Sequence, residues 1–200
     1  KVKLGDYIER YINRRLGLAE STIANRKSIG AIWVLPYWKH WSVSSITKTD
    51  VEDWMEDIAR DGTKNGVKDK TKPGATKPAK ADTIIKAHGI LLASLEAAVE
   101  ANLISKNPAS GVRKPKPEAA PNTYLSHSEV AELAAEIDPR SRTLVGLLAY
   151  TGMRFGEATA LRVGSVQLNS RKISITRSIT SVNGTLVEGP TKSHEKRDLY

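Results

Sequence analysis

The sequence predicts a mainly helical fold in two parts, with a small antiparallel sheet in the second part. Through the first hundred residues, apolar positions recur at the spacing of an amphipathic helix. Beyond Gly164 they alternate instead, as they do in strands. Between these regions, the basic and proline-containing stretch 111–122, GVRKPKPEAAPN, has neither period. We therefore expect a first domain at 1–110, a linker at 111–122 and a second domain at 123–200.

Two amphipathic helices are expected to open the first domain. The first should run from about Leu4 to Gly17, because glycine is common just past a helix end. The second should be capped by Ser21 or Thr22 and should end at Pro36, whose ring disrupts a helix. Their apolar positions are Tyr7, Ile8, Tyr11, Ile12, Leu16, Ile23, Ile29, Ile32 and Trp33.

A third and a fourth helix should complete this domain. Residues 49–52, TDVE, have the pattern of a capping box ahead of apolar positions spaced at i, i+3, i+4 and i+7. The fourth helix is expected at 82–101, and His88 lies on or near its apolar stripe, which favours a packed role over a catalytic one. Three large aromatic residues are interpreted as core rather than as base-stacking residues: Trp33, Trp38 and Trp41.

Residues 60–80 lie between the third and fourth helices and are rich in lysine, glycine and proline, with almost no large apolar residue. Two interpretations stay open. The segment is either a solvated linker or a basic arm that grips phosphates, adding affinity but little sequence information.

The second domain is expected to begin with helices. Ser126 to Glu129 form another capping-box pattern, ahead of a short apolar period that includes Val130 and Leu133. A further helix from about residue 140 to Tyr150 leads into the segment YTGMRFGEATAL.

Strands are expected after this segment. Ile173, Ile175 and Ile179 alternate with polar residues, and Asn183-Gly184 is a strong signal for a two-residue hairpin turn. The stretch 191–197, TKSHEKR, should form the next turn, and 198–200 should begin a further strand.

The composition narrows the possible chemistry. Lys and Arg outnumber Asp and Glu by 31 to 22, a net charge of +9, which favours a polyanionic partner such as nucleic acid. Without cysteine the chain has no disulfide, thiolate metal site or cysteine nucleophile, and its four scattered histidines do not suggest a metal site. No apolar run approaches the roughly 18 residues of a membrane span. We expect a cytoplasmic protein that uses no metal or cofactor.

The segment YTGMRFGEATAL, 150–161, carries the candidate chemistry. Gly152 is a helix-stop signal, which places Arg154 in the first turn of a new helix, where an anion is favoured. Glu157 follows three residues later and can hold the guanidinium group in one orientation. The R-x-x-E spacing alone also describes an ordinary surface ion pair.

With these motifs in place, the chain resembles the tyrosine recombinase, or phage integrase, family. The resemblance is carried by LPYW, ITKTDVEDW, LEAAVEANLISKNPASGV and, most specifically, YTGMRFGEATALRVGSV. It implies a four-helix, SAM-like core-binding domain followed by the N-terminal part of an α+β catalytic domain. It also implies that Arg154 binds the scissile phosphate, that Glu157 supports it, and that Lys192 within TKSHEKR is the catalytic lysine, with Lys196 as an alternative.

The reaction implied by the resemblance is metal-free phosphoryl transfer on double-stranded DNA attachment sites. A tyrosine attacks a DNA phosphate to form a 3′-phosphotyrosine bond, and the full-length protein acts as a homotetramer in a bacterial host cell. The family's H-x-x-R arginine and its tyrosine nucleophile are expected downstream of this chain, and Tyr200 is interpreted as structural. The chain is therefore expected to be catalytically incomplete, without the arm-binding domain of many phage integrases.

Two other functions remain open at this stage: a non-catalytic DNA-binding module that regulates recombination or transcription, and a type IB topoisomerase, which the core-binding segments disfavour. Six basic residues are candidate DNA contacts: Arg26, Lys27, Lys80, Lys86, Lys114 and Lys116.

Overall fold

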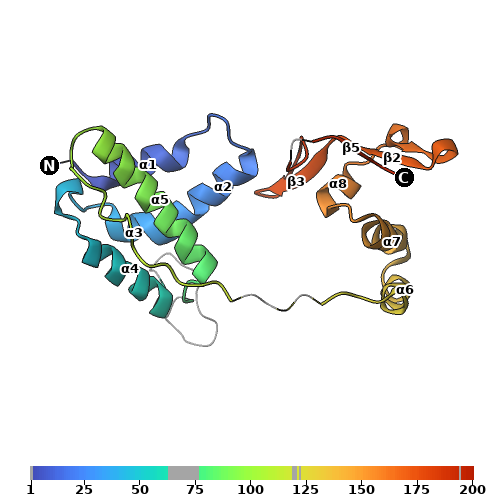
Figure 1. Ribbon diagram of the computed structural model, residues 1–200, viewed down its shortest axis with the longest axis horizontal. Helices are drawn as coiled ribbons and strands as arrows, with labels where there is room; N and C mark the ends of the chain where they lie inside the picture. Colours follow the sequence, from blue (N-terminus) through green and yellow to red (C-terminus); the bar gives the residue numbers. More distant parts are fainter. Residues whose placement is uncertain (1, 63–76, 119–120, 122, 194) are drawn as a thin grey trace. The chain divides into compact units, whose positions relative to one another are not determined.

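The computed structural model describes residues 2–62, 77–118, 121, 123–193 and 195–200. The chain folds as two compact units, Lys1–Ala120 and Pro121–Tyr200 (Figure 1). It is mainly helical with small antiparallel sheets, as the sequence predicts. In the described part of the chain, no helix has the length and apolarity needed to cross a membrane.

The first unit is a helical bundle in which α1 and α5 lie side by side (Figure 1). Its core includes Trp38 and Trp54, both fully buried, with ring centroids 5.6 Å apart in an edge-on arrangement. Trp33 is also buried and Trp41 is half-buried against the core, so the interpretation of these tryptophans as core residues is confirmed. The α-helices of this unit are α1 (Leu4–Asn13), α2 (Glu20–Ile29), α3 (Leu35–Trp38), α4 (Lys48–Arg60) and α5 (Ala81–Glu100).

The second helix does not end at Pro36, contrary to the sequence prediction. It passes through a π-helical turn, η1 (Gly30–Val34), and continues as α3 with Pro36 near the start of that segment. A proline inside a regular α-helix clashes with the carbonyl four residues earlier, and the wider π-turn relieves that clash. Its expected caps are also wrong, since Ala19 is the N-cap residue and no side chain caps α2.

Two other helix ends differ from the prediction. The first helix ends at Asn13, so Leu16 is exposed and Gly17, with φ 73°, lies in the following loop. The capping box of α4 is formed by Thr47 and Asp50: the Thr47 Oγ1 accepts the Asp50 N–H at 3.2 Å, and the Asp50 carboxylate accepts the Thr47 N–H at 2.8 Å. The prediction placed this box at 49–52, two residues too late.

His88 on α5 has a packed role, as expected. The residue is 1% exposed, and its Nε2 lies 2.9 Å from the carbonyl oxygen of Ala109. A carbonyl can only accept, so Nε2 carries the proton and Nδ1, which has no partner among the described residues, is the unprotonated nitrogen. Ala109 and Val112 belong to the same core, which fastens the chain leaving α5 to the helix.

The second unit combines three helices with two small sheets. Its helices are α6 (His127–Glu136), α7 (Arg142–Thr151) and α8 (Phe155–Thr159). The Ser126–Glu129 capping box of α6 is present as predicted. A small core of Met153, Ala158 and Ile175 holds this unit together.

The strands form two sheets, where the sequence predicted one. A three-stranded antiparallel sheet has the order β1-β2-β5, and a separate hairpin pairs β3 with β4. Asn183 and Gly184 turn the hairpin with φ of 50° and 81°, the positive values of the expected two-residue turn. The strands are β1 (Val166–Gln167), β2 (Lys172–Ile175), β3 (Ser178–Val182), β4 (Thr185–Gly189) and β5 (Arg197–Leu199).

Candidate functional site

The segment 150–161 forms a sharp junction between two helices. Gly152 adopts a left-handed conformation, φ 63°, and its N–H bonds to the Leu148 carbonyl at 3.2 Å, which ends α7. Arg154 has an extended backbone and is the N-cap residue of α8. The expectation that Arg154 lies in the first turn is therefore wrong by one position, because the helix begins only at Phe155.

Glu157 is the buried centre of this junction. Its side chain is 1% exposed, whereas that of Arg154 is 55% exposed. The Glu157 carboxylate accepts the Arg154 backbone N–H at 3.0 Å and the Arg154 Nη1 at 3.0 Å. Arg154 thus has its main chain and one guanidinium nitrogen fixed by the same carboxylate.

Arg197 is the second partner of this carboxylate. Its Nη1 lies 3.1 Å from Glu157 Oε1, and its Nη2 lies 2.7 Å from Glu157 Oε2, the bidentate geometry of a strong charge-assisted pair. The Arg197 side-chain hydrogen bonds, opposed by burial and helped by those of Arg154, lower the pKa of Glu157 to about 2. Glu157 is therefore an anion at neutral pH and accepts from both arginines.

Sequence reasoning missed Arg197. The residue lies 40 positions after Glu157, and its place is set by the pairing of β5 with β2, where it stands opposite Ile175, the buried end of β2. Alternation along β5 leaves Arg197 and Leu199 half-buried and Asp198 exposed. The sequence signal for Arg197 was an arginine at an inward-facing position of a strand, which indicates a buried acidic partner. The identity of that partner cannot be predicted from the sequence, because Glu157 lies 40 residues earlier.

Lys192 lies in the turn that precedes β5 and is exposed. In the part of the chain that the structure describes, Lys192 forms no ion pair with Glu157. The neighbouring Thr191 is buried, and its hydroxyl donates to the Glu195 carbonyl at 2.8 Å, which closes the turn. The structure therefore brings Glu157 and Arg154 together and places Lys192 in a closed turn a few residues before Arg197.

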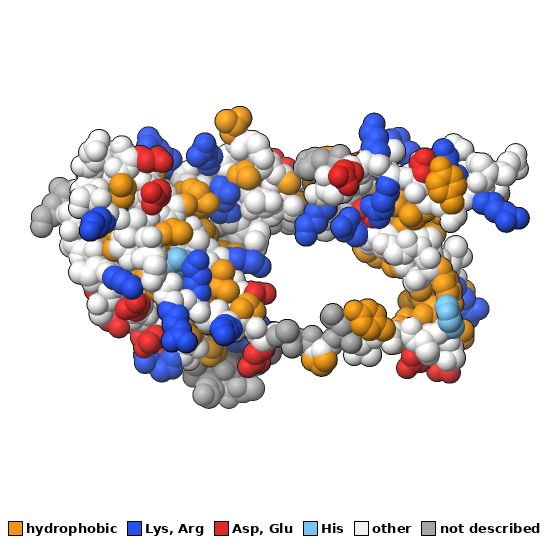
Figure 2. Space-filling view, in the orientation of Figure 1, with side chains coloured by type: hydrophobic (Ala, Val, Ile, Leu, Met, Phe, Trp, Pro, Cys, Tyr) orange, Lys and Arg blue, Asp and Glu red, His pale blue; other side chains and the backbone are white. Residues whose placement is uncertain are grey.

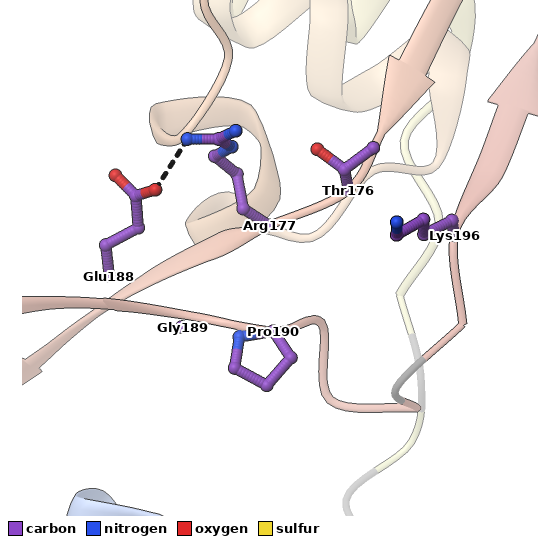
Figure 3. Close-up of a pocket in the computed structure, with 6 residues that line it drawn as sticks. All are labelled: Thr176, Arg177, Glu188, Gly189, Pro190 and Lys196. Carbon is purple, nitrogen blue, oxygen red and sulfur yellow. Dashed lines mark hydrogen bonds and ion pairs between the residues drawn. The ribbon is translucent and has the colours of Figure 1, made fainter.

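Lys196 lines an open cavity of about 540 Å³ in the second unit. Figure 3 shows the lysine on one side of this cavity and Arg177 on another, with Arg177 bonded to Glu188. Glu188 accepts from Arg177 at 2.7 Å and from Arg162 at 3.1 Å. The other residues that line the cavity are Thr176, Gly189 and Pro190.

The six candidate DNA contacts all lie in the first unit. Arg26 is engaged within the protein: its guanidinium carbon lies 4.4 Å from the centre of the Tyr11 ring, and its Nη1 bonds to the Tyr11 carbonyl at 3.3 Å. Lys27 is half-buried, whereas Lys80, Lys86, Lys114 and Lys116 are exposed. Figure 2 shows Lys and Arg side chains on the visible face of each unit. Within the described ranges, no group of His, Asp and Glu side chains is arranged to hold a metal ion.

No family model matches the sequence. Among curated proteins, the chain is 29% identical over 109 residues to the integrases of Mycobacterium phages D29 and FRAT1, a match covering 54% of this chain. The match covers 29% of the D29 protein and 32% of the FRAT1 protein, so it spans about a third of these relatives.

Among solved structures, the fold matches the Tn1549 transposon integrase in complex with a circular intermediate DNA, with a TM-score of 0.76 over 99% of this chain. This chain has the fold of the Tn1549 integrase, and over 109 residues its sequence is similar to those of the two phage integrases. The match covers 60% of the Tn1549 chain at 14% sequence identity. A second structure of that integrase, in complex with transposon right end DNA, matches with a TM-score of 0.75 over 98% of this chain at 15% identity, covering 60% of the solved chain.

Proposed function

We propose that this integrase relative binds and clamps duplex DNA as part of a site-specific recombinase. In this proposal, Arg154 binds the scissile phosphate, Glu157 holds Arg154 in position, and Lys192 protonates the departing 5′-oxygen. The full-length protein would cleave DNA through a 3′-phosphotyrosine intermediate and rejoin it, as a homotetramer on paired attachment sites in the cytoplasm of a bacterial host.

The arrangement of Arg154 is the observation that carries this proposal. A buried carboxylate fixes its backbone and one guanidinium nitrogen, while more than half of its side chain faces solvent. An arginine in this state is pre-oriented, and its remaining N–H groups can take a phosphate in bidentate form. Because charge builds up on phosphate oxygens during phosphoryl transfer, pre-placed donors lower the barrier more than mobile ones do.

The first unit supplies positive charge for the rest of the DNA backbone. Lys80, Lys86, Lys114 and Lys116 are exposed and are proposed to contact phosphates. Arg26 and Lys27 stay in this proposal with a smaller contribution, since Arg26 is held by Tyr11. Contacts of this kind position a protein on DNA without reading sequence, and they make binding strongly salt-dependent.

Two assays test the proposal. Fluorescence anisotropy with a labelled 30-base-pair duplex should give a dissociation constant that rises steeply between 50 and 200 mM salt, by about a hundredfold if four phosphates are contacted. Arg154→Ala should weaken binding and lower the salt slope by about 0.9. The matched control is Arg140→Ala, which removes the same charge from an exposed position of the second unit and should change affinity by less than twofold. Equal effects of the two variants would remove Arg154 from the phosphate site.

Catalysis is tested separately with a nicked duplex that traps covalent protein–DNA adducts. The longest natural chain that contains this sequence should form an adduct, and its Arg154→Lys variant should not, while it still binds DNA within a few fold. A natural protein that binds DNA and never forms an adduct would support the non-catalytic DNA-binding module instead.

A further inference from the structure

We propose that Arg197 is a positioning residue of the phosphate site, which acts on Arg154 through the buried carboxylate of Glu157. This inference rests on the proposed phosphate-binding role of Arg154. Arg197 ends the TKSHEKR stretch but had no role in the sequence-based predictions, and the proposal gives the Glu157 carboxylate a second function besides capping α8.

The hydrogen bonds of Glu157 are shared evenly between the two arginines. Oε1 accepts Nη1 of Arg154 at 3.0 Å and Nη1 of Arg197 at 3.1 Å. Oε2 accepts the Arg154 backbone N–H at 3.0 Å and Nη2 of Arg197 at 2.7 Å. Arg197 therefore binds both carboxylate oxygens at once, which restricts rotation of the carboxylate group. The guanidinium of Arg154 is oriented in turn, because its Nη1 donates to one of these fixed oxygens.

Charge gives Arg197 a second effect on the site. Glu157 and Arg154 alone form a neutral pair, which attracts a phosphate weakly. With Arg197 the three side chains carry a net charge of +1 around a carboxylate that is 1% exposed. Arg197 offsets the charge of Glu157, which leaves the positive charge of Arg154 free to attract an anion, so this electrostatic effect is also exerted through Arg154.

Arg197 also joins Arg154 to the turn that carries Lys192. The turn is closed at one end by buried Thr191, which bonds to the Glu195 carbonyl, and it runs directly into β5 at Arg197. The bidentate pair with Glu157 ties the start of β5 to α8. The Arg197–Glu157 ion pair thus fixes the position of Arg154 and also the end of the turn that carries Lys192, the proposed general acid.

A double-mutant cycle on DNA affinity tests this role, using the chain at a temperature where thermal unfolding shows every variant to be folded. Arg154→Ala is expected to weaken duplex binding by about tenfold. Arg197→Ala should weaken it by about fivefold or more, yet it should add less than twofold when Arg154 is already alanine, because it acts through that residue. A residue with a separate DNA contact would give multiplied effects.

Arg197→Lys separates orientation from charge, because lysine keeps the positive charge but cannot grip both oxygens in a planar fork. Arg197→Lys should recover part of the affinity lost in Arg197→Ala, and Arg140→Ala should again leave binding unchanged. If Arg154→Ala weakens binding while both Arg197 variants bind normally, or if the Arg154 and Arg197 effects multiply, the positioning role is refuted and the phosphate site survives. If Arg154→Ala itself has no effect, the proposed function fails.

Discussion

Replacing Glu157 with glutamine should destabilise the second unit by about 3 kcal/mol at neutral pH. The pKa of Glu157 falls from 4.5 to about 2, and at about 1.4 kcal/mol for each pH unit this difference corresponds to about 3 kcal/mol of folding free energy. Glutamine keeps the shape of the side chain but loses the charge, and its amide group turns N–H donors toward arginine donors. This loss of folding free energy lies near the lower end of the range for breaking a buried ion pair, because both arginines remain accessible to water.

The effect has a defined pH dependence. A carboxyl group whose pKa is lowered by folding contributes stability above its unfolded value and loses it as the pH falls through its folded value. The difference between wild type and Glu157→Gln should therefore be constant above about pH 5 and should shrink between pH 4.5 and about 2. Glu132→Gln, on an exposed position of α6, is the control and should change stability by less than about 0.5 kcal/mol.

The assay has to report on the second unit. All four tryptophans lie before residue 55, so their fluorescence follows the first unit only. Hydrogen exchange of peptides from 142–200, measured across a urea series at pH 7 and pH 3, gives the stability of the second unit, and tryptophan fluorescence should stay unchanged as an internal control. A loss below about 1 kcal/mol at pH 7, or a difference that persists undiminished at pH 3, would refute the charged-centre reasoning.

Three further predictions concern the packing around these elements. Gly156→Ala should destabilise the second unit by more than about 2 kcal/mol, since a Cβ there would collide with the backbone of β3. The control Gly146→Ala, in an open part of α7, should stabilise it by about 0.5–1 kcal/mol in urea unfolding. Thr47→Ala should cost the first unit about 1 kcal/mol and Thr49→Ala almost nothing, because only the former caps α4. Burial is the largest influence on the pKa of His88 and lowers it. Because the unfolded chain then binds the proton more readily than the folded one, the first unit should lose stability as the pH falls below about 6.5. His88→Gln should flatten that dependence, and a steeper loss of tryptophan fluorescence in the variant would contradict it.

Element types were predictable wherever a periodic pattern coincided with a local stop or cap. The helices, the hairpin turn at Asn183-Gly184 and the helix end at Gly152 follow from nearest-neighbour chemistry, which the sequence records directly. Helix ends that depend on tertiary packing were less predictable. The chain passes Pro36 within a helical segment because a π-turn absorbs the proline, and no local signal announces that turn.

The sequence by itself determined a basic two-part chain and the arginine and glutamate of the candidate site, since two residues three positions apart on one helical turn lie close together. Only the tertiary structure decided the state of that pair. It buried Glu157 while leaving Arg154 half open, and through the pairing of β5 with β2 it brought Arg197 across 40 residues to the same carboxylate. An exposed Arg–Glu pair is worth little in water, whereas a buried carboxylate shared by two arginines is a fixed charged centre. That difference depends on burial and strand register, which residue spacing does not encode.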